Sequence, residues 1–367
     1  MPPGFESLLG VRTSQPPKAK MAFSFLFFSD VREDVSDAEK YRFMRDVTLF
    51  ADREGFEAIY IPERHFSEFG SIYANPAVMA AYLIPQTSRI RIRTAGVSLP
   101  LHHPAEVVEN WAMNDVLSGG RIDLGFGSGW SFNDFVLAPD AYDERRALCN
   151  DRIPLIQQLW RGEAVTFPGP QGKEVTIRVF PRPVQPELKV WMLVAQNEEG
   201  FRYAGKQGYN VFTMLYGYNL EALKIKIDAY RRARQEAGFP PNEGVVTLML
   251  HTMIDADPTL IEQAVEQPFK QYIKTALKAH VKAAQDANVE RTAGLGIEEE
   301  EKMLAYAYQR YAKTGALFGT VEQGVSMVNQ AIAAGVDEIA CLVDFGVDYQ
   351  AVKGSLPYLK QLVSRYC

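Results

Sequence analysis

Acid, guanidinium, imidazole and aromatic side chains follow one another in the segment ERHFSEFGSIYANP, which begins at Glu63. An imidazole can exchange protons near neutral pH, and a guanidinium can hold an anion through charge-assisted hydrogen bonds. The segment has no regular apolar spacing, so we predict a loop whose side chains serve chemistry or binding. Its candidate catalytic residues are Glu63, Arg64 and His65.

A structural interpretation of the same segment stays open. Glu63 and Arg64 would then form a salt bridge with each other. Phe66 and Phe69 would pack against the protein, and Asn75, which precedes a proline, would start the next helix.

The composition is that of a globular protein with ample material for a core. The chain has 367 residues, of which 47% are hydrophobic and 23% are charged. Its formal net charge of −6 disfavours nucleic acid and anionic membranes as partners, because both require a basic surface. No apolar run approaches the roughly 18 residues of a membrane span, so we expect no membrane partner.

The cysteines and histidines fit neither a disulfide framework nor a metal centre. Cys149, Cys341 and Cys367 are odd in number, lie far apart and form no CxxC pattern, which favours a reducing cytoplasm. The five histidines show no HxH or HExxH spacing, so we predict no metal site.

Strand and helix patterns alternate along the chain. The predicted strands cover residues 23–28, 58–61, 90–97, 122–126, 190–194, 210–214, 245–251 and 338–343. The predicted helices cover residues 37–55, 76–87, 104–117, 143–161, 197–207, 219–237 and 320–334, followed by a terminal helix. Eight strand–helix units favour a parallel sheet closed into an α/β (β/α)8 TIM barrel.

This pattern predicts a single domain over residues 21–367, preceded by a flexible N-terminal arm over residues 1–20. A helical insertion at about residues 256–318 separates the seventh strand from its helix. Long insertions after barrel strands often become lids, and a solvated helical decoration is the alternative.

Four more segments follow strands and should share the mouth of the barrel with Glu63. Ala95 and Gly96 end the third strand, where small residues would let a flat ring approach the backbone. Gly127, Ser128, Gly129 and Trp130 follow the fourth strand, and Gln196, Asn197, Glu198 and Gly200 open a short helix after the fifth. A helix start offers free N–H groups to an anion. His251 lies near the end of the seventh strand.

The motifs ERHFSEFG, LPLHHPAEVVENW, LSGGRIDLGFGSGWSFNDF and AQNEEGFRYAGKQGYNVF resemble the bacterial luciferase-like flavin monooxygenases. The resemblance runs from about Phe23 to the C-terminus. It is strongest to the subgroup found with nonribosomal peptide and polyketide assembly lines, in natural-product biosynthesis.

The resemblance implies an enzyme that uses reduced FMN (FMNH2) and O2, through a flavin C4a-peroxide, to oxidise a small or carrier-tethered substrate. It places the flavin ring near Ala95, Gly96 and residues 127–129, and the phosphate near residues 196–200. It also implies a homodimer formed through the helices after strands two and three.

Two departures from the family pattern remove phosphate contacts. Ser128 stands where luciferases carry an arginine, and Gly200 stands where the subgroup commonly has a threonine. We therefore expect FMN to be held loosely and to arrive reduced from a separate flavin reductase. The catalytic histidine of luciferases aligns with Arg64, which leaves His65 beside it.

Roles for the remaining residues follow as expectations. Arg64 would stabilise a peroxyanion or an acidic substrate group, and His65 would exchange a proton. Phe66 and Trp130 would cover the ring or the substrate, and His251 would line the substrate pocket.

Two other functions stay open. One is hydride transfer with a deazaflavin, a cofactor that related barrels bind in the same mouth. The other is a non-catalytic flavin-binding partner of an assembly line.

Overall fold

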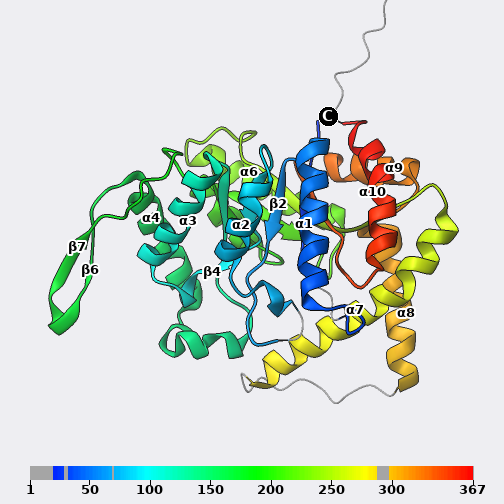
Figure 1. Ribbon diagram of the computed structural model, residues 1–367, viewed down its shortest axis with the longest axis horizontal. Coiled ribbons are helices and arrows are strands. Elements are labelled where there is room, and N and C mark those ends of the chain that lie inside the picture. Colours follow the sequence, from blue (N-terminus) through cyan, green and yellow to red (C-terminus); the bar gives the residue numbers. More distant parts are fainter. Residues whose placement is uncertain (1–19, 29–31, 68–69, 287–296, 367) are drawn as a thin grey trace, which may run out of the picture.

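The computed structural model describes residues 20–28, 32–67, 70–286 and 297–366. Eight parallel strands close on themselves, since β12 pairs with β1 and β10 pairs with β9. The strands are β1 (Ala22–Leu26), β2 (Ala58–Ile61), β3 (Arg91–Thr94), β5 (Ile122–Gly127), β8 (Val190–Leu193), β9 (Asn210–Met214), β10 (Val246–Ile254) and β12 (Glu338–Leu342). The predicted (β/α)8 barrel is confirmed, and helices surround it (Figure 1).

The surrounding helices lie close to their predicted ranges. They are α1 (Asp37–Glu54), α2 (Pro76–Leu83), α3 (Pro104–Ser118), α4 (Arg145–Arg161), α5 (Glu198–Lys206), α6 (Leu220–Glu236), α9 (Val321–Ala333) and α10 (Tyr349–Val363). Local chemistry sets their ends. A capping box of Ser36 and Glu39 starts α1, and the left-handed Gly55 ends it. Asn75 caps α2, as the structural interpretation of its segment expected.

Two predicted elements end or break earlier than expected, and one strand was not predicted. The helix expected over residues 76–87 ends at Leu83 and continues as a short 3-10 turn that contains Pro85, a residue without a backbone N–H. The strand expected over residues 90–97 breaks at Gly96, whose φ is 105°, into β3 and β4 (Val97–Ser98). The short strand β11 (Ala316–Gly319) was not predicted.

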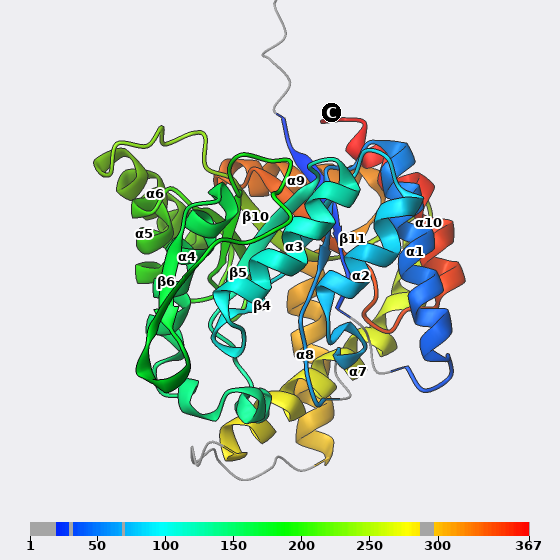
Figure 2. The same ribbon diagram turned by 60° about the vertical axis from the view of Figure 1, so that its left-hand side comes forward.

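The segment between β10 and α9 forms two helices and this additional strand. The helices α7 (Pro258–Asp286) and α8 (Ile297–Thr314) lie across one end of the barrel in both ribbon views (Figures 1 and 2). β11 pairs with the last four residues of β10, from His251 to Ile254. A hairpin of β6 (Val165–Pro168) and β7 (Glu174–Ile177) projects from the side (Figure 1).

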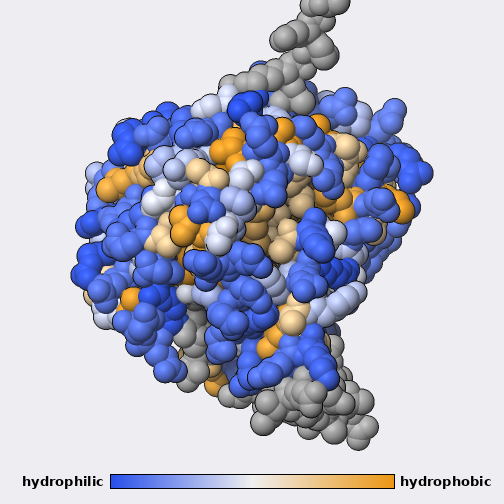
Figure 3. Space-filling view, turned by 90° about the vertical axis from the view of Figure 1, so that its right-hand side faces the viewer, coloured by the Kyte–Doolittle hydropathy of each residue, from blue (hydrophilic) through white to orange (hydrophobic). Residues whose placement is uncertain are grey.

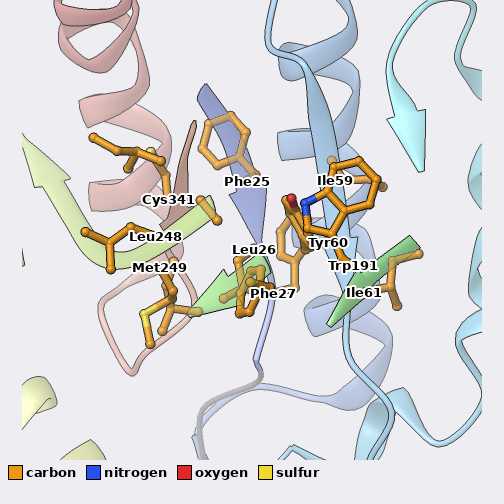
Figure 4. Packing of buried hydrophobic residues seen from close by; sticks show 14 of the residues in the cluster. Phe25, Leu26, Phe27, Ile59, Tyr60, Ile61, Trp191, Leu248, Met249 and Cys341 are labelled. Carbon is orange, nitrogen blue, oxygen red and sulfur yellow. The ribbon is translucent and has the colours of Figure 1, made fainter. Parts of the chain in front are cut away.

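Large apolar side chains of the strands form the core, where Phe25, Leu26, Phe27, Tyr60 and Trp191 are all buried (Figure 4). The Phe25 ring packs outward against Phe50 of α1. The outer face seen in Figure 3 is mostly hydrophilic around a small apolar area. No helix in the described part of the chain is long and apolar enough to cross a membrane.

A buried ionic network links the strands near their amino-terminal ends. Arg93 on β3 lies 2.9 Å from Glu338 on β12 and 3.0 Å from Asp123 on β5. Its guanidinium also donates to the Tyr60 hydroxyl at 2.6 Å. Thr247 on β10 bonds Glu338 at 2.9 Å, so one dry cluster ties five strands together.

Loss of one charge from this network should destabilise the protein. Glu338→Gln keeps the side-chain volume but leaves Arg93 short of a charged partner, and we expect the free energy of unfolding to fall by about 3 kcal/mol. The control Glu322→Gln removes a carboxylate that pairs with Arg365 at the surface, where about 1 kcal/mol or less is expected. Urea denaturation of both variants measures the difference, and equal losses would contradict the assigned role of the network.

Candidate active site

The loop after β2 carries a buried carboxylate that holds two imidazoles. Glu63 Oε1 lies 2.9 Å from His65 Nε2 and 2.7 Å from His102 Nε2. Its second oxygen accepts the backbone N–H of Ser98 at 3.3 Å. The salt bridge to Arg64 that the structural interpretation expected is not among the contacts of the Glu63 carboxylate, whose two oxygens bind these three groups instead.

Glu63 and His102 hold each other in the charged form. Burial raises the pKa of Glu63, but the hydrogen bonds from His102 and His65 outweigh it and leave the pKa below its usual value. Burial lowers the pKa of His102, and the bond to Glu63 outweighs that effect and raises it. The cluster can therefore store a proton beside the mouth. The sequence analysis counted His102 only among the five histidines that lack metal-ligand spacing, although its LPLHHP segment follows strand three on the same face.

The Arg64 guanidinium lies over two aromatic rings. Its Cζ is 3.9 Å from the centre of the Phe28 ring and 5.2 Å from that of Trp130. Burial lowers the pKa of Arg64 to about 10, so the guanidinium stays charged at neutral pH. Gly70 makes room for it, because a Cβ at that position would come within 2.5 Å of Arg64 Cδ.

Exposed aromatic residues stand at the rim of this loop cluster. Phe66 has a φ of 51° and is 59% exposed, and its ring lies 5.6 Å from that of His65. Trp130 is 38% exposed. A bulky residue at positive φ is uncommon, and such strain is often found at ligand sites.

Glycines after β3 and β5 are already packed by protein side chains. A Cβ on Gly96 would lie 2.3 Å from Leu193, and one on Gly129 would lie 3.0 Å from the Phe135 ring. Gly127 is less crowded, with Leu193 at 3.8 Å. Ala95 and Ser128 are partly buried beside them. A flat ring could approach the backbone at Gly127, and at Gly96 only if Leu193 moved.

The start of α5 offers an incomplete anion site. Asn197 Oδ1 already accepts the Glu199 N–H at 2.9 Å, and Glu198 pairs with Arg202 at 2.8 Å. Gln196 bonds the Tyr216 carbonyl at 3.4 Å. A Cβ on Gly200 would lie 2.7 Å from Val194, so this glycine packs inward.

Lys226 on α6 is a cation near that helix start, and sequence reasoning missed it. Its Nζ lies 3.5 Å from the centre of the Tyr218 ring, and the Tyr218 hydroxyl donates to the Ala195 carbonyl at 2.6 Å. Burial lowers the pKa of Lys226, and the Glu198 carboxylate acts in the opposite direction. Lys226 could therefore approach a phosphate at residues 196–200.

His251 lies beneath helix α7 of the insertion. The rings of Phe269 and Tyr272 on α7 stand edge-on to it at 4.8 and 5.0 Å, and Phe345 lies at 5.3 Å. Its Nε2 has no hydrogen-bond partner, and burial lowers its pKa to about 3. The imidazole is therefore neutral at physiological pH.

The part of the chain that the structure describes contains no group of three or more histidine, cysteine, aspartate or glutamate side chains able to hold a metal ion.

Ionisable and glycine-rich loops lie at the carboxyl ends of the eight parallel strands. This is the face where (β/α)8 barrel enzymes carry their active sites. Residues 21–338 match the luciferase-like monooxygenase family, and the chain belongs to this family. It is thus an enzyme of the monooxygenase class. The oxygenase component of the flavin-dependent trigonelline monooxygenase of Acinetobacter baylyi is 26% identical over 344 residues, which cover 92% of each chain.

Solved structures share the fold at low sequence identity. A monooxygenase of Streptomyces bottropensis superposes with a TM-score of 0.78 at 22% identity, over 95% of this chain and 100% of that one. The oxygenating constituent of a Pseudomonas putida diketocamphane monooxygenase, in complex with FMN, gives 0.73 at 17%, over 94% and 98%. An F420-dependent secondary alcohol dehydrogenase gives 0.70 at 15%, over 95% and 99%. The named relatives support a flavin cofactor.

The depressed pKa of His251 predicts acid lability. Between pH 6.5 and about 3 the unfolded chain binds a proton at His251 that the folded protein does not, so stability falls as pH falls through this range. From pH 6.5 to 4.5 this loss should be about 2 kcal/mol. His251→Phe should remove it, as urea denaturation at the two pH values would show. Equal pH dependence in the variant and the parent protein would contradict the assignment.

Proposed function

We propose that this enzyme uses reduced FMN and O2 to oxidise a small or carrier-tethered intermediate of natural-product biosynthesis. The observation that carries the proposal is the Glu63 cluster, which holds two imidazoles beside the stacked guanidinium of Arg64 at the barrel mouth. The family match and the name of the trigonelline monooxygenase relative support oxygenation with a flavin.

The residues present fit FMN, with a weak phosphate site. The backbone at Gly127 leaves space for a flat ring, and Lys226 with the start of α5 could hold a phosphate. When bound, reduced flavin supplies electrons and activates O2, which is chemistry that amino-acid side chains lack.

The side chains around the mouth would bind, orient and exchange protons. Glu63 accepts from His65 Nε2, which fixes the imidazole and leaves His65 Nδ1 to exchange a proton with a reacting group. Arg64, fixed between Phe28 and Trp130, would hold negative charge that develops nearby. Phe66 and Trp130 would exclude water from the reacting atoms.

The weak phosphate site favours a flavin that exchanges with a separate reductase. Glu198 and Glu199 place two carboxylates in the first turn of α5, where negative charge competes with a phosphate. Asn197 occupies one of the N–H groups that a phosphate would use. The Acinetobacter relative is likewise named as an oxygenase component.

An apolar surface on α2 and α3 favours a homodimer. These two helices contact each other and expose five large apolar side chains between them. They are Val78, Tyr82, Met113, Val116 and Leu117. Such a patch on a monomer commonly marks a protein interface.

Hydride transfer with a deazaflavin is the second candidate, because an F420-dependent dehydrogenase shares the fold. The absorption spectrum of the bound cofactor separates the two, and only reduced FMN consumes O2. A non-catalytic flavin-binding partner would yield no oxidised product.

Loss of Arg64 or His65 should uncouple the reaction. With reduced FMN, 18O2 and candidate amino-acid or acyl substrates, mass spectrometry should find a product that gains one 18O atom. In Arg64→Ala and His65→Ala the product formed per O2 consumed should fall by about tenfold or more, and hydrogen peroxide should replace it. Arg53→Ala, on the exposed face of α1, is the control. Unchanged coupling in both site variants would refute these roles.

Loss of Lys226 should weaken recognition of the FMN phosphate. Fluorescence titration with FMN and with riboflavin isolates the phosphate contribution as the ratio of two affinities. Lys226→Met should lower that ratio by about tenfold, the value of one charge-assisted hydrogen bond. Lys224→Met, which removes an exposed partner of Asp228, should leave it unchanged. FMN retained through purification at micromolar or tighter affinity would count against loose binding.

A further inference from the structure

A buried carboxylate in the loop after β5 lacks a partner for one oxygen. Asp134 lies in the 3-10 segment η4 (Phe132–Leu137) and is only 3% exposed. Its Oδ1 has no hydrogen-bond partner. A buried polar atom left unpaired costs free energy, so folded proteins seldom keep one without a use for it.

The Asp134 carboxyl group belongs to the same mouth as the Glu63 cluster. Burial raises its pKa, while His65 and Arg64 act on it as nearby positive charges and Glu63 as a nearby negative one. The Ser131 side chain already bonds the carboxyl group, and the Asp134 N–H donates to the Ser131 carbonyl at 3.3 Å. The carboxyl is thus held in place with one acceptor left over.

Aromatic residues are the sequence neighbours of Asp134 in this loop. Trp130 and Phe132 are 38% and 39% exposed on either side of Ser131. Phe132 and Phe135 both stand edge-on to Tyr142, at 5.0 and 5.1 Å. An apolar wall with one unsatisfied carboxylate oxygen is the pattern of a site that reads one polar group on an otherwise apolar ligand.

Resting on the proposed oxygenation at this mouth, we propose that Asp134 is a specificity residue that accepts a hydrogen bond from a protonated primary or secondary amine of the substrate. The substrate class is therefore small ammonium compounds with an apolar or aromatic body, which includes amino acids. An ammonium group matches the site better than a hydroxyl, because its positive charge adds a Coulomb attraction to the carboxylate that a neutral hydroxyl lacks.

The second charge beside Asp134 narrows the class further. Arg64 carries a positive charge that acts on the Asp134 carboxyl, so these two side chains present charges of opposite sign. A ligand with an ammonium and an acidic group would meet both. A ligand with an acidic group but no ammonium group would be repelled by the carboxylates of Glu63 and Asp134. It would also leave the Asp134 carboxylate without a partner.

Thermal unfolding with matched ligand pairs tests the proposal without flavin or O2. The probes are benzylammonium, phenethylammonium and 3-phenylpropylammonium chlorides, each against the alcohol of the same skeleton at the same millimolar concentration. At least one ammonium probe should raise Tm by about 2 °C or more above its alcohol. If no ammonium probe exceeds its alcohol, the proposal is overturned.

Two variants assign the effect to Asp134. Asp134→Asn should lower the affinity for the ammonium probe by about tenfold and abolish its advantage over the alcohol. The Tm of this variant without ligand should equal or exceed that of the parent protein, since a neutral amide replaces a buried charge. Asp134→Ser provides a second, shorter replacement if the amide disturbs folding. Asp143→Asn, which changes an exposed carboxylate in the same loop, should keep the discrimination.

Discrimination that survives in both Asp134 variants would overturn the assignment. The result is separate from the proposed oxygenation. Selective ammonium binding without any oxidised product would leave the specificity site standing and remove the proposed function. If the protein forms oxidised product but binds ammonium and alcohol probes equally, the proposed function stands and the specificity site is removed.

Discussion

The buried guanidinium of Arg93 is the constraint on which the barrel depends. A permanently charged group in a dry interior is tolerated only when its partners are all in place. Here they come from β2, β5 and β12, and Trp191 on β8 lies 3.9 Å below the Arg93 Cζ. Only one register of the strands satisfies every contact. That register decides where each strand ends, and so which loop residues meet at the mouth.

The two ends of the barrel use buried carboxylates in opposite ways. Glu338 faces an arginine, whose charge does not change in the physiological range, so that end of the barrel is electrically fixed. Glu63 instead bonds two imidazoles, His65 and His102, and its bond to His102 raises the pKa of that imidazole. The same fold therefore provides a rigid base and a mouth that can take up and release protons.

Much of the fold could be predicted because strand and helix periods alternate clearly, and caps such as Ser36 and Gly55 mark helix ends in the sequence. β11 was missed because it has only four residues, which are too few to show the alternation of apolar and polar side chains that marks a strand. The location of Glu63, Arg64 and His65 followed from their position after a strand.

The contacts within the site could not be predicted. His102 lies 39 residues beyond Glu63, and only the strand register brings the two together. Asp134 and Lys226 were not singled out in the sequence, since burial, an unpaired oxygen and ring contacts are properties of the folded chain. Neither Gly96 nor Gly200 revealed in sequence that its free space is filled by Leu193 or Val194. The insertion that covers the mouth is also anchored at both ends: it leaves from β10 and returns through β11, which is hydrogen-bonded to the same strand. It cannot swing outward as one arm unless that short ladder breaks.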